Sequence, residues 1–269
     1  MGVRNYIGGL RHGRSGTRRL DLPDADRSRL QSTVAALCPA FDPLSVLPAA
    51  ELRRVPRLVP MALAATTEAL EDAGLTNPDA RASAGLLLGT GAGGIDFTLD
   101  QAQIAYDDAS QRGISLWTIT NATHGNLAGE LSIHLGLKGP SLCVSTGCAS
   151  SSDAIGHAMD LLRSDRPGAP DIMVVVGADA HVRWETLRGM ELLRCISTRD
   201  FSDRDAEPAT ASRPFDATRD GFVLGEGAWA LVLERASHAR ARGAACLGEA
   251  LGYAATCDAY HRVRPAPDT

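Results

Sequence analysis

The sequence predicts an α/β fold in which a mixed, mostly parallel sheet carries helices on both faces. Short apolar runs alternate along the chain with segments of helical periodicity. The runs within 84–88 and 171–177 are continuously apolar, which is typical of strands buried on both faces. A strand, a helix and a second strand follow one another between 139 and 177, and this order implies a parallel, right-handed crossover.

The positions of apolar residues, glycines and polar runs predict the individual elements. Residues 1–50 are weakly patterned, so we expect a loop-rich lead-in. A helix is predicted over 58–73, because apolar residues recur on one face and Gly74 stands where a C-terminal cap is expected. The polar segment 197–220 is expected to lie outside the core. Further helices are predicted at 118–136, 152–164 and 235–242, and further strands before Gly147 and at 84–88, 171–177, 228–233 and 246–255.

The loop at 89–94 has the spacing G-x-G-x-x-G after a predicted strand, as in dinucleotide-binding turns. Such turns normally open their domain, and an acidic residue closes the next strand; here Asp107 and Asp108 fall in a polar, helical stretch instead. We therefore favour a tight glycine turn that lets the backbone approach another segment.

Cys148 is the strongest candidate for a reactive group. A short apolar strand turns through Gly147 directly into a predicted helix, which places this thiol at a helix N-terminus. Unpaired N–H groups and the helix dipole favour a thiolate there, and the small residues that follow leave room for a substrate. The alternative is that Cys148 is a small buried residue, as many cysteines are. Spacing alone leaves both interpretations open.

Composition limits the class of protein. The 269 residues are 44% hydrophobic and 22% charged, which is ordinary for a globular protein. A net charge of −5 and an aromatic content of 4% argue against nucleic-acid binding. No apolar run reaches membrane-spanning length, and the N-terminus has no signal-peptide pattern. The six cysteines show neither zinc-ligand spacing nor a disulfide framework, so we expect reduced thiols, no bound metal and a cytoplasmic protein.

Four motifs follow one another along the chain: Val144-Ser-Thr-Gly-Cys-Ala-Ser-Ser151, Ile196-Ser-Thr-Arg199, the run from Ser212 through Arg-Pro-Phe-Asp and Asp-Gly-Phe-Val-Leu-Gly-Glu-Gly to Ala228, and Thr256-Cys-Asp-Ala-Tyr-His261. Together they resemble the N-terminal half of a β-ketoacyl synthase of fatty-acid or polyketide assembly, a member of the thiolase-like superfamily. The resemblance runs from about Gly13 to the end of the chain.

The resemblance implies a thiolase-like half over 51–255, with 256–269 as the start of the second half. It implies that Cys148 takes an acyl chain from the phosphopantetheine of an acyl carrier protein, with no resident cofactor. The backbone N–H of this cysteine would contribute to an oxyanion hole. Met190 would gate the acyl tunnel, although core packing is equally plausible for it, and His261 would lie near the substrate entrance.

Three arginines match family positions that dock the acidic carrier protein: Arg53, Arg57 and Arg194. The alternative is an ordinary solvated basic surface. Charge complementarity would mainly raise the association rate and orient the carrier. His124 and His157 match no catalytic position of the family and are expected to be structural.

The departures from the family pattern concern the groups that perform condensation. The family's first strand is not matched, nor are the two histidines that decarboxylate the extender and stabilise its enolate; none of the seven histidines here replaces them. We therefore expect an acyl-accepting half that needs a complementary ketosynthase half or another dimer partner. The alternatives are a non-catalytic partner resembling a chain-length factor, which usually lacks the cysteine, and an inactive truncated ketosynthase.

Overall fold

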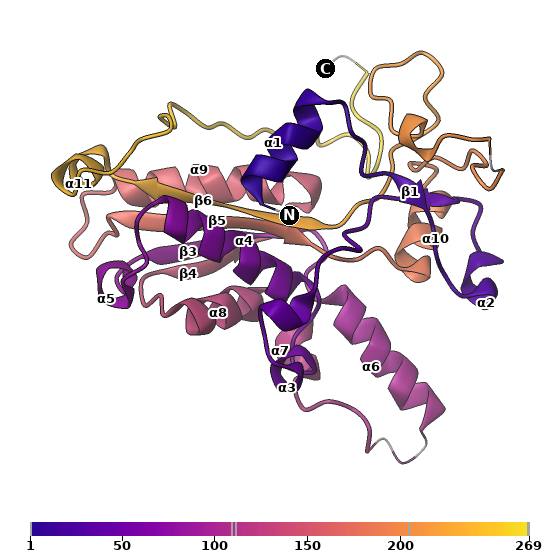
Figure 1. Cartoon of the computed structure of the whole chain (residues 1–269), viewed down its shortest axis with the longest axis horizontal. Helices are drawn as coiled ribbons and strands as arrows, with labels where there is room; N and C mark the ends of the chain where they lie inside the picture. The colour runs from indigo at the N-terminus through magenta and orange to yellow at the C-terminus, as the bar shows by residue number, and fades with distance from the viewer. Residues whose placement is uncertain (1, 109, 111, 204, 268–269) are drawn as a thin grey trace. The chain divides into compact units, whose positions relative to one another are not determined.

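The computed structural model describes residues 2–108, 110, 112–203 and 205–267, and these form two compact units (Figure 1). The units alternate along the sequence. The first unit comprises Met1–His12, Cys38–His181 and Glu226–Leu251, and the second comprises Gly13–Leu37, Val182–Gly225 and Gly252–Thr269. Each unit has buried apolar clusters of its own.

A four-stranded sheet forms the centre of the first unit, in the order β4-β3-β5-β6. The first three strands in this order are parallel and β6 is antiparallel, which confirms the predicted mixed, mostly parallel sheet. Gly89 pairs with Val144 on one side and with Gly177 on the other, so β3 and β4 end level with each other while β5 continues to Asp179. The strands are β3 (Gly85–Gly89), β4 (Ser141–Val144), β5 (Ile172–Asp179) and β6 (Gly227–Glu234).

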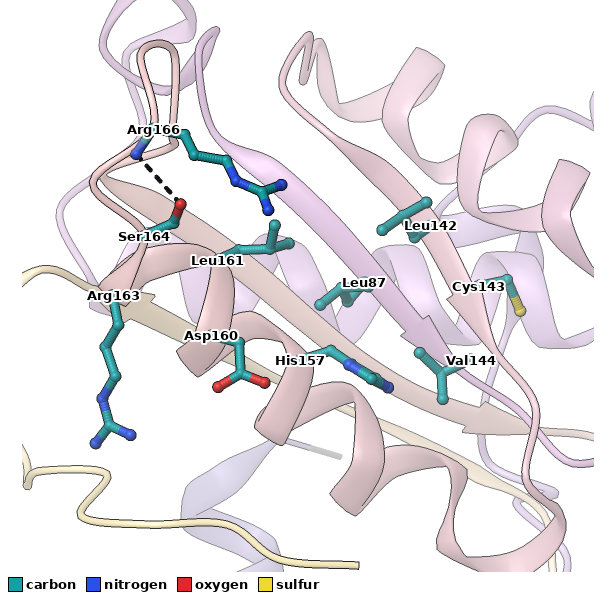
Figure 2. A pocket seen from close by; sticks show the side chains of 10 residues that line it. All are labelled: Leu87, Leu142, Cys143, Val144, His157, Asp160, Leu161, Arg163, Ser164 and Arg166. Carbon is teal, nitrogen blue, oxygen red and sulfur yellow. Dashed lines mark hydrogen bonds between the residues drawn. The ribbon is translucent and has the colours of Figure 1, made fainter.

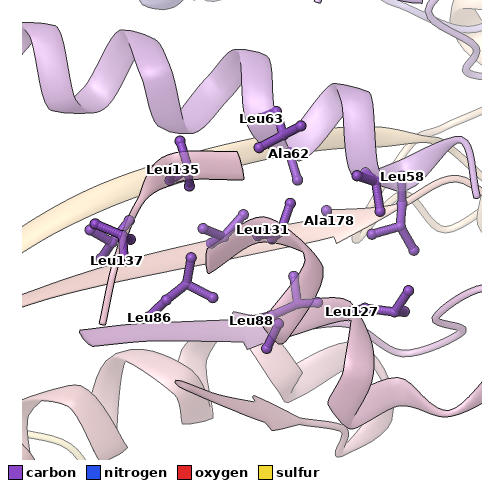
Figure 3. Close-up of a cluster of buried hydrophobic side chains, with 14 of the residues drawn as sticks. Leu58, Ala62, Leu63, Leu86, Leu88, Leu127, Leu131, Leu135, Leu137 and Ala178 are labelled. Carbon is purple, nitrogen blue, oxygen red and sulfur yellow. The ribbon is translucent and has the colours of Figure 1, made fainter. Parts of the chain in front are cut away.

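Helices cover both faces of this sheet because successive strand side chains point to opposite sides. Leu86 and Leu88 pack with helices α4 (Leu58–Asp72) and α8 (His124–Leu135), as Figure 3 shows. Leu87 packs on the opposite face with α9 (Ser150–Arg163). The continuous apolar runs seen in the sequence therefore serve two cores at once.

The remaining elements of the first unit are further helices, and two of the predicted elements are wrong. The single helix expected at 118–136 is broken at Thr123, whose backbone is extended. The strand expected at 246–255 is irregular, and Leu247 and Leu251 are exposed, unpaired with any strand of the described chain. The helices are α1 (Val3–Arg11), η1 (Pro43–Ser45), α3 (Ala49–Leu52), α5 (Pro78–Arg81), α6 (Ile95–Asp107), α7 (Thr118–Ala122) and α11 (Ala236–Ala241).

The second unit is built on a short antiparallel ladder and one longer helix. Leu187 of α10 is fully buried among apolar side chains of this unit. Phe201 is 2% exposed, so the polar segment 197–220 does contribute to a core, contrary to its composition. The elements are β1 (Arg18–Arg19), α2 (Asp24–Arg27), β2 (Val34–Ala35), α10 (Trp184–Leu192) and η3 (Pro208–Thr210).

Across the part of the chain that the structure describes, every helix is too short or too polar to cross a lipid bilayer.

Candidate functional site

Cys148 lies in a single 3₁₀ turn, η2 (Gly147–Ala149), between the end of β4 and the start of α9. Gly147 has φ 67°, a left-handed conformation that glycine adopts at little cost, and this turns the chain from strand to helix. The Cys148 side chain is exposed. The predicted strand, turn and helix are confirmed, and the alternative of a buried cysteine is wrong.

Side chains from the first turn of α9 bond to the residues just before Cys148 and hold the η2 turn in place. Ser150 Oγ donates to the carbonyl of Gly147 over 2.6 Å and accepts the N–H of Thr146 over 2.9 Å. The Thr146 hydroxyl donates in turn to the carboxylate of Asp153. A carboxylate in the first turn of a helix is also favoured by the helix dipole. The turn that presents Cys148 is therefore tied to the start of α9 by its own sequence neighbours.

The glycine loop after β3 packs directly against this turn. A Cβ at Gly89 would lie 2.6 Å from the carbonyl oxygen of Ser150, and one at Gly91 would lie 3.1 Å from that of Gly147. Only glycine allows such close approach of two backbones. The chain's own backbone occupies the space over these glycines, so the close-approach interpretation is confirmed and the nucleotide-turn interpretation is wrong.

Cys143 is a second thiol nearby, on β4, in a different environment. Its side chain is half-buried and packs against the main apolar cluster. Burial, and then the negative charge of Asp179, raise the pKa of Cys143 to about 11. A neutral thiol at physiological pH is a poor nucleophile.

The two arginines of the first unit that were predicted to dock a carrier protein lie in different environments. Arg53 caps the C-terminal end of α3 and is exposed. Arg57 makes a two-pronged ion pair with Glu226, in which Nε and Nη2 each donate over 2.9 Å. The Glu226 side chain is 3% exposed. Burial alone would raise the pKa of Glu226, but the hydrogen bonds from Arg57 and from the N–H of Cys38 outweigh it, and the net pKa is lowered.

The other predicted site residues belong to the second unit. Arg194 follows α10, is exposed, and has φ 56°, which is uncommon for a residue with a side chain. Met190 packs on the Leu187 cluster, and its Sδ is 3.7 Å from the Sγ of Cys195. His261 is exposed, and its Nδ1 accepts the N–H groups of Val263 and Arg264.

A cavity of about 620 Å³ lies between β4 and α9, and the sequence did not indicate it (Figure 2). Leu87, Leu142, Val144 and Leu161 form its apolar part. Its polar lining comes from α9 and the loop after it: His157, Asp160, Arg163, Ser164 and Arg166. Leu142 is half exposed, because β4 is the edge strand of the sheet. This part of the first unit presents an apolar surface beside the helix that begins after Cys148.

His124 and His157 lie on different helices, and His157 lines the cavity together with Asp160. His124 begins α8, and His157 lies on the exposed side of α9. No cluster of three His, Cys, Asp or Glu side chains suited to a metal ion occurs among the residues that the structure describes.

Comparisons with known proteins agree with this arrangement. The family model for the β-ketoacyl synthase N-terminal domain matches residues 1–239. A 3-oxoacyl-[acyl-carrier-protein] synthase 2 of Synechocystis sp. is 37% identical over 267 residues, which cover 99% of this chain and 62% of that protein. A Streptomyces rimosus protein named as an oxytetracycline polyketide putative β-ketoacyl synthase 1 is 36% identical, and the match covers 97% of this chain and 60% of that protein.

A solved structure, the ishigamide ketosynthase/chain length factor, superimposes with a TM-score of 0.79 at 30% identity. The match covers 97% of this chain and 61% of that one. The chain therefore spans about 60% of the length of the relatives it matches.

Proposed function

Because the chain belongs to the β-ketoacyl synthase N-terminal domain family, we propose that it is the acyl-accepting half of a ketosynthase and that Cys148 carries the acyl group. The main observation is the exposed thiol of Cys148 on a braced turn at the start of α9. Covalent catalysis needs a nucleophile that is accessible and held in place.

The proposed step is a transfer between two thioesters. Cys148 Sγ attacks the carbonyl carbon of an acyl thioester, a new C–S bond forms, and the donor's C–S bond breaks. The donor sulfur leaves and takes up the proton lost by Cys148, so no oxidant or metal is needed. N–H groups at the start of α9 would stabilise the oxyanion that forms in between. By analogy with the Synechocystis relative's name, the donor is an acyl group on an acyl carrier protein.

Acylation by a small thioester tests this proposal. We expect the intact chain to gain the mass of one acyl group at Cys148, while Cys148→Ala gains none. Cys246→Ala is the matched control, because Cys246 is an exposed thiol of the same unit outside the turn. Labelling that persists in Cys148→Ala would refute the proposal, and a wild-type chain that is never acylated would favour the chain-length-factor alternative.

Carrier docking is proposed for Arg53 and Arg194, which are exposed and can meet an acidic partner. Arg57 is already paired with Glu226, so we expect it to contribute less to docking. Arg53→Glu should slow acylation by the carrier protein, most strongly at low salt, and leave acylation by a small thioester unchanged. An equal fall in the acylation rate with the carrier protein and with the small thioester would contradict a docking role for Arg53.

Met190 is proposed to gate an acyl tunnel, and His261 to lie near its entrance, as the family resemblance implies. The packing of Met190 on the Leu187 cluster also fits a core role. Met190→Ala distinguishes the two: a gate residue changes the preferred acyl length, whereas a core residue changes only stability.

A complementary ketosynthase half is the proposed partner for condensation. The apolar wall of the cavity beside α9 and the half-exposed Leu142 on an edge strand offer a surface for it. The similar ishigamide protein is itself named as a ketosynthase/chain length factor, which supports a pairing of this kind. Leu142→Glu should weaken the association of this chain with the complementary half, measured by sedimentation, and should leave Cys148 acylation intact. Unchanged association between the two halves would argue against this surface.

A further inference from the structure

Asp179 gathers three donors from the glycine loop at 89–94. This aspartate ends β5, and its Oδ1 accepts the hydroxyl of Thr90 over 2.8 Å and the N–H of Ala92 over 2.9 Å. Its Oδ2 accepts the N–H of Gly91 over 3.0 Å. Hydrogen bonds to an ionised carboxylate are stronger than neutral ones. One side chain therefore ties three successive residues of the loop, Thr90, Gly91 and Ala92, to the end of β5.

The loop that Asp179 holds is the support for the turn that carries Cys148. Gly91 faces the carbonyl of Gly147, and Gly89 faces that of Ser150, both at distances that leave no space for a methyl group without movement. Protein interiors are packed closely enough that a shift of one wall moves its neighbour. A displaced glycine loop would thus displace Gly147, the residue next to Cys148.

The bonds within the turn constrain only one side of it. Ser150 and Asp153 tie the turn to α9, whereas the glycine loop supports it from β3. The carboxylate of Asp179 bonds to the glycine loop, and its Oδ1 also lies 3.6 Å from Nδ1 of His181. Its effect on the position of the Cys148 thiol therefore passes through the glycine loop.

We propose that Asp179 is a positioning residue, which fixes the thiol of Cys148 relative to the start of α9 by holding Gly91 against Gly147. For acyl transfer this inference rests on the proposed function, but for the reactivity of the thiol it does not.

Asp179→Asn is the discriminating variant because it changes the three bonds unequally. An asparagine oxygen in the place of Oδ1 can still accept from Thr90 and Ala92. The amide NH₂ then replaces Oδ2 and faces the N–H of Gly91, so two donors meet and Gly91 is pushed away. The bond that is lost is the one closest to Gly147.

The experiment measures alkylation of the full chain by iodoacetamide, with Cys246 as the internal reference thiol. In Asp179→Asn the ratio of Cys148 to Cys246 rates should fall about two- to fivefold, the range expected when a group loses its place at a helix N-terminus. With a small acyl thioester, kcat should fall about tenfold with little change in KM, because reacting groups are misplaced rather than lost.

Asp220→Asn is the matched control, because Asp220 of the second unit also accepts several bonds, from Ser197, Arg199 and Arg213. It should lower the urea midpoint and leave the Cys148 to Cys246 ratio unchanged. An unchanged ratio in Asp179→Asn, or an equal fall in Asp220→Asn, would overturn the inference.

Gly91→Ala tests the same link while the carboxylate keeps its charge, since the added methyl would lie at an ordinary contact distance of 3.5 Å from Asp179 Oδ2. The added methyl would lie 3.1 Å from the Gly147 carbonyl oxygen and should also lower the ratio. Gly129→Ala should not, because its new methyl would meet no described atom within 4 Å apart from the adjacent backbone of its own helix. If neither Gly91→Ala nor Asp179→Asn changes the ratio, the inference fails. If the wild-type chain is never acylated, the proposed function fails while the alkylation ratios still decide the role of Asp179.

Discussion

Cys143 and Cys148 lie five positions apart in the same strand and turn, yet the fold gives them opposite properties. Cys143 packs against the apolar cluster on β4, and burial raises its pKa to about 11. Cys148 is exposed where α9 begins. Residue type is the same in both cases, so the difference shows that location alone decides which thiol can act as a nucleophile.

The largest expected effect is the difference in labelling between these two thiols. With a pKa of about 11, only about one Cys143 side chain in a thousand is ionised at pH 8. Iodoacetamide should therefore modify Cys148 at least about a hundredfold faster than Cys143 in the folded chain. Peptide mapping by mass spectrometry measures both rates. Comparable alkylation rates of Cys143 and Cys148 in the folded chain would contradict this prediction. As a control, the two thiols should react at equal rates in the urea-unfolded chain.

Ser150→Ala should disturb Cys148 without reaching Cys143. The variant removes the partner of the Thr146 N–H and the Gly147 carbonyl, which should cost about 1–2 kcal/mol of folding free energy. We expect Cys148 alkylation to slow a few-fold, with Cys143 unchanged. Urea unfolding and alkylation rates measure the two effects. Ser152→Ala is a matched control in the same helix; if it slows alkylation equally, the bonds of Ser150 are not the cause.

Asp179→Asn should move the two thiols in opposite directions. The negative charge of Asp179 contributes, after burial, to the raised pKa of Cys143, so its removal should lower that pKa from about 11 and speed Cys143 alkylation at high pH. Cys148 alkylation should slow because the glycine loop shifts. A pH series of both rates checks this. If the alkylation rates of Cys143 and Cys148 both rose in Asp179→Asn, the variant would instead have destabilised the fold as a whole.

Glu226→Gln should leave the ratio of the two thiols unchanged while lowering stability. The variant leaves the Arg57 charge without its carboxylate partner. Because the Arg57 side chain is 36% exposed, water partly compensates, and we expect the free energy of unfolding to fall by about 1–2 kcal/mol. The pKa of Glu226 is lowered in the folded state, so the contribution is full above its ordinary value of 4.5 and is lost as the pH falls through the lowered value.

Urea midpoints measured between pH 7 and pH 3 give the check on Glu226→Gln. The difference in urea midpoint between wild type and Glu226→Gln should become smaller as the pH falls toward 3. A gap that is constant with pH would mean that the carboxylate charge is not the source of the stability.

Most elements of the first unit could be predicted from the sequence because their signals are local. The apolar period marks α4, the unbroken apolar run marks β5, and the glycine before a small-residue helix places Cys148 between strand and helix. The errors arose where a local pattern did not decide the backbone. The segment 246–255, predicted as a strand, pairs with no strand of the described chain and instead accepts hydrogen bonds from Arg163 at the carbonyls of Ala250 and Leu251. The segment 118–136 has helical periodicity but bends at Thr123.

The sequence by itself determined the fold class, the family resemblance and the identity of Cys148 as the candidate nucleophile. Only the tertiary structure decided what surrounds that cysteine: Asp179 lies 88 positions from Gly91, and Glu226 lies 169 positions from Arg57. Neither pairing leaves a periodic signal, because a hydrogen bond between distant segments depends on how strands order in the sheet. Strand order in turn follows from burying apolar faces together, which is a property of the whole unit.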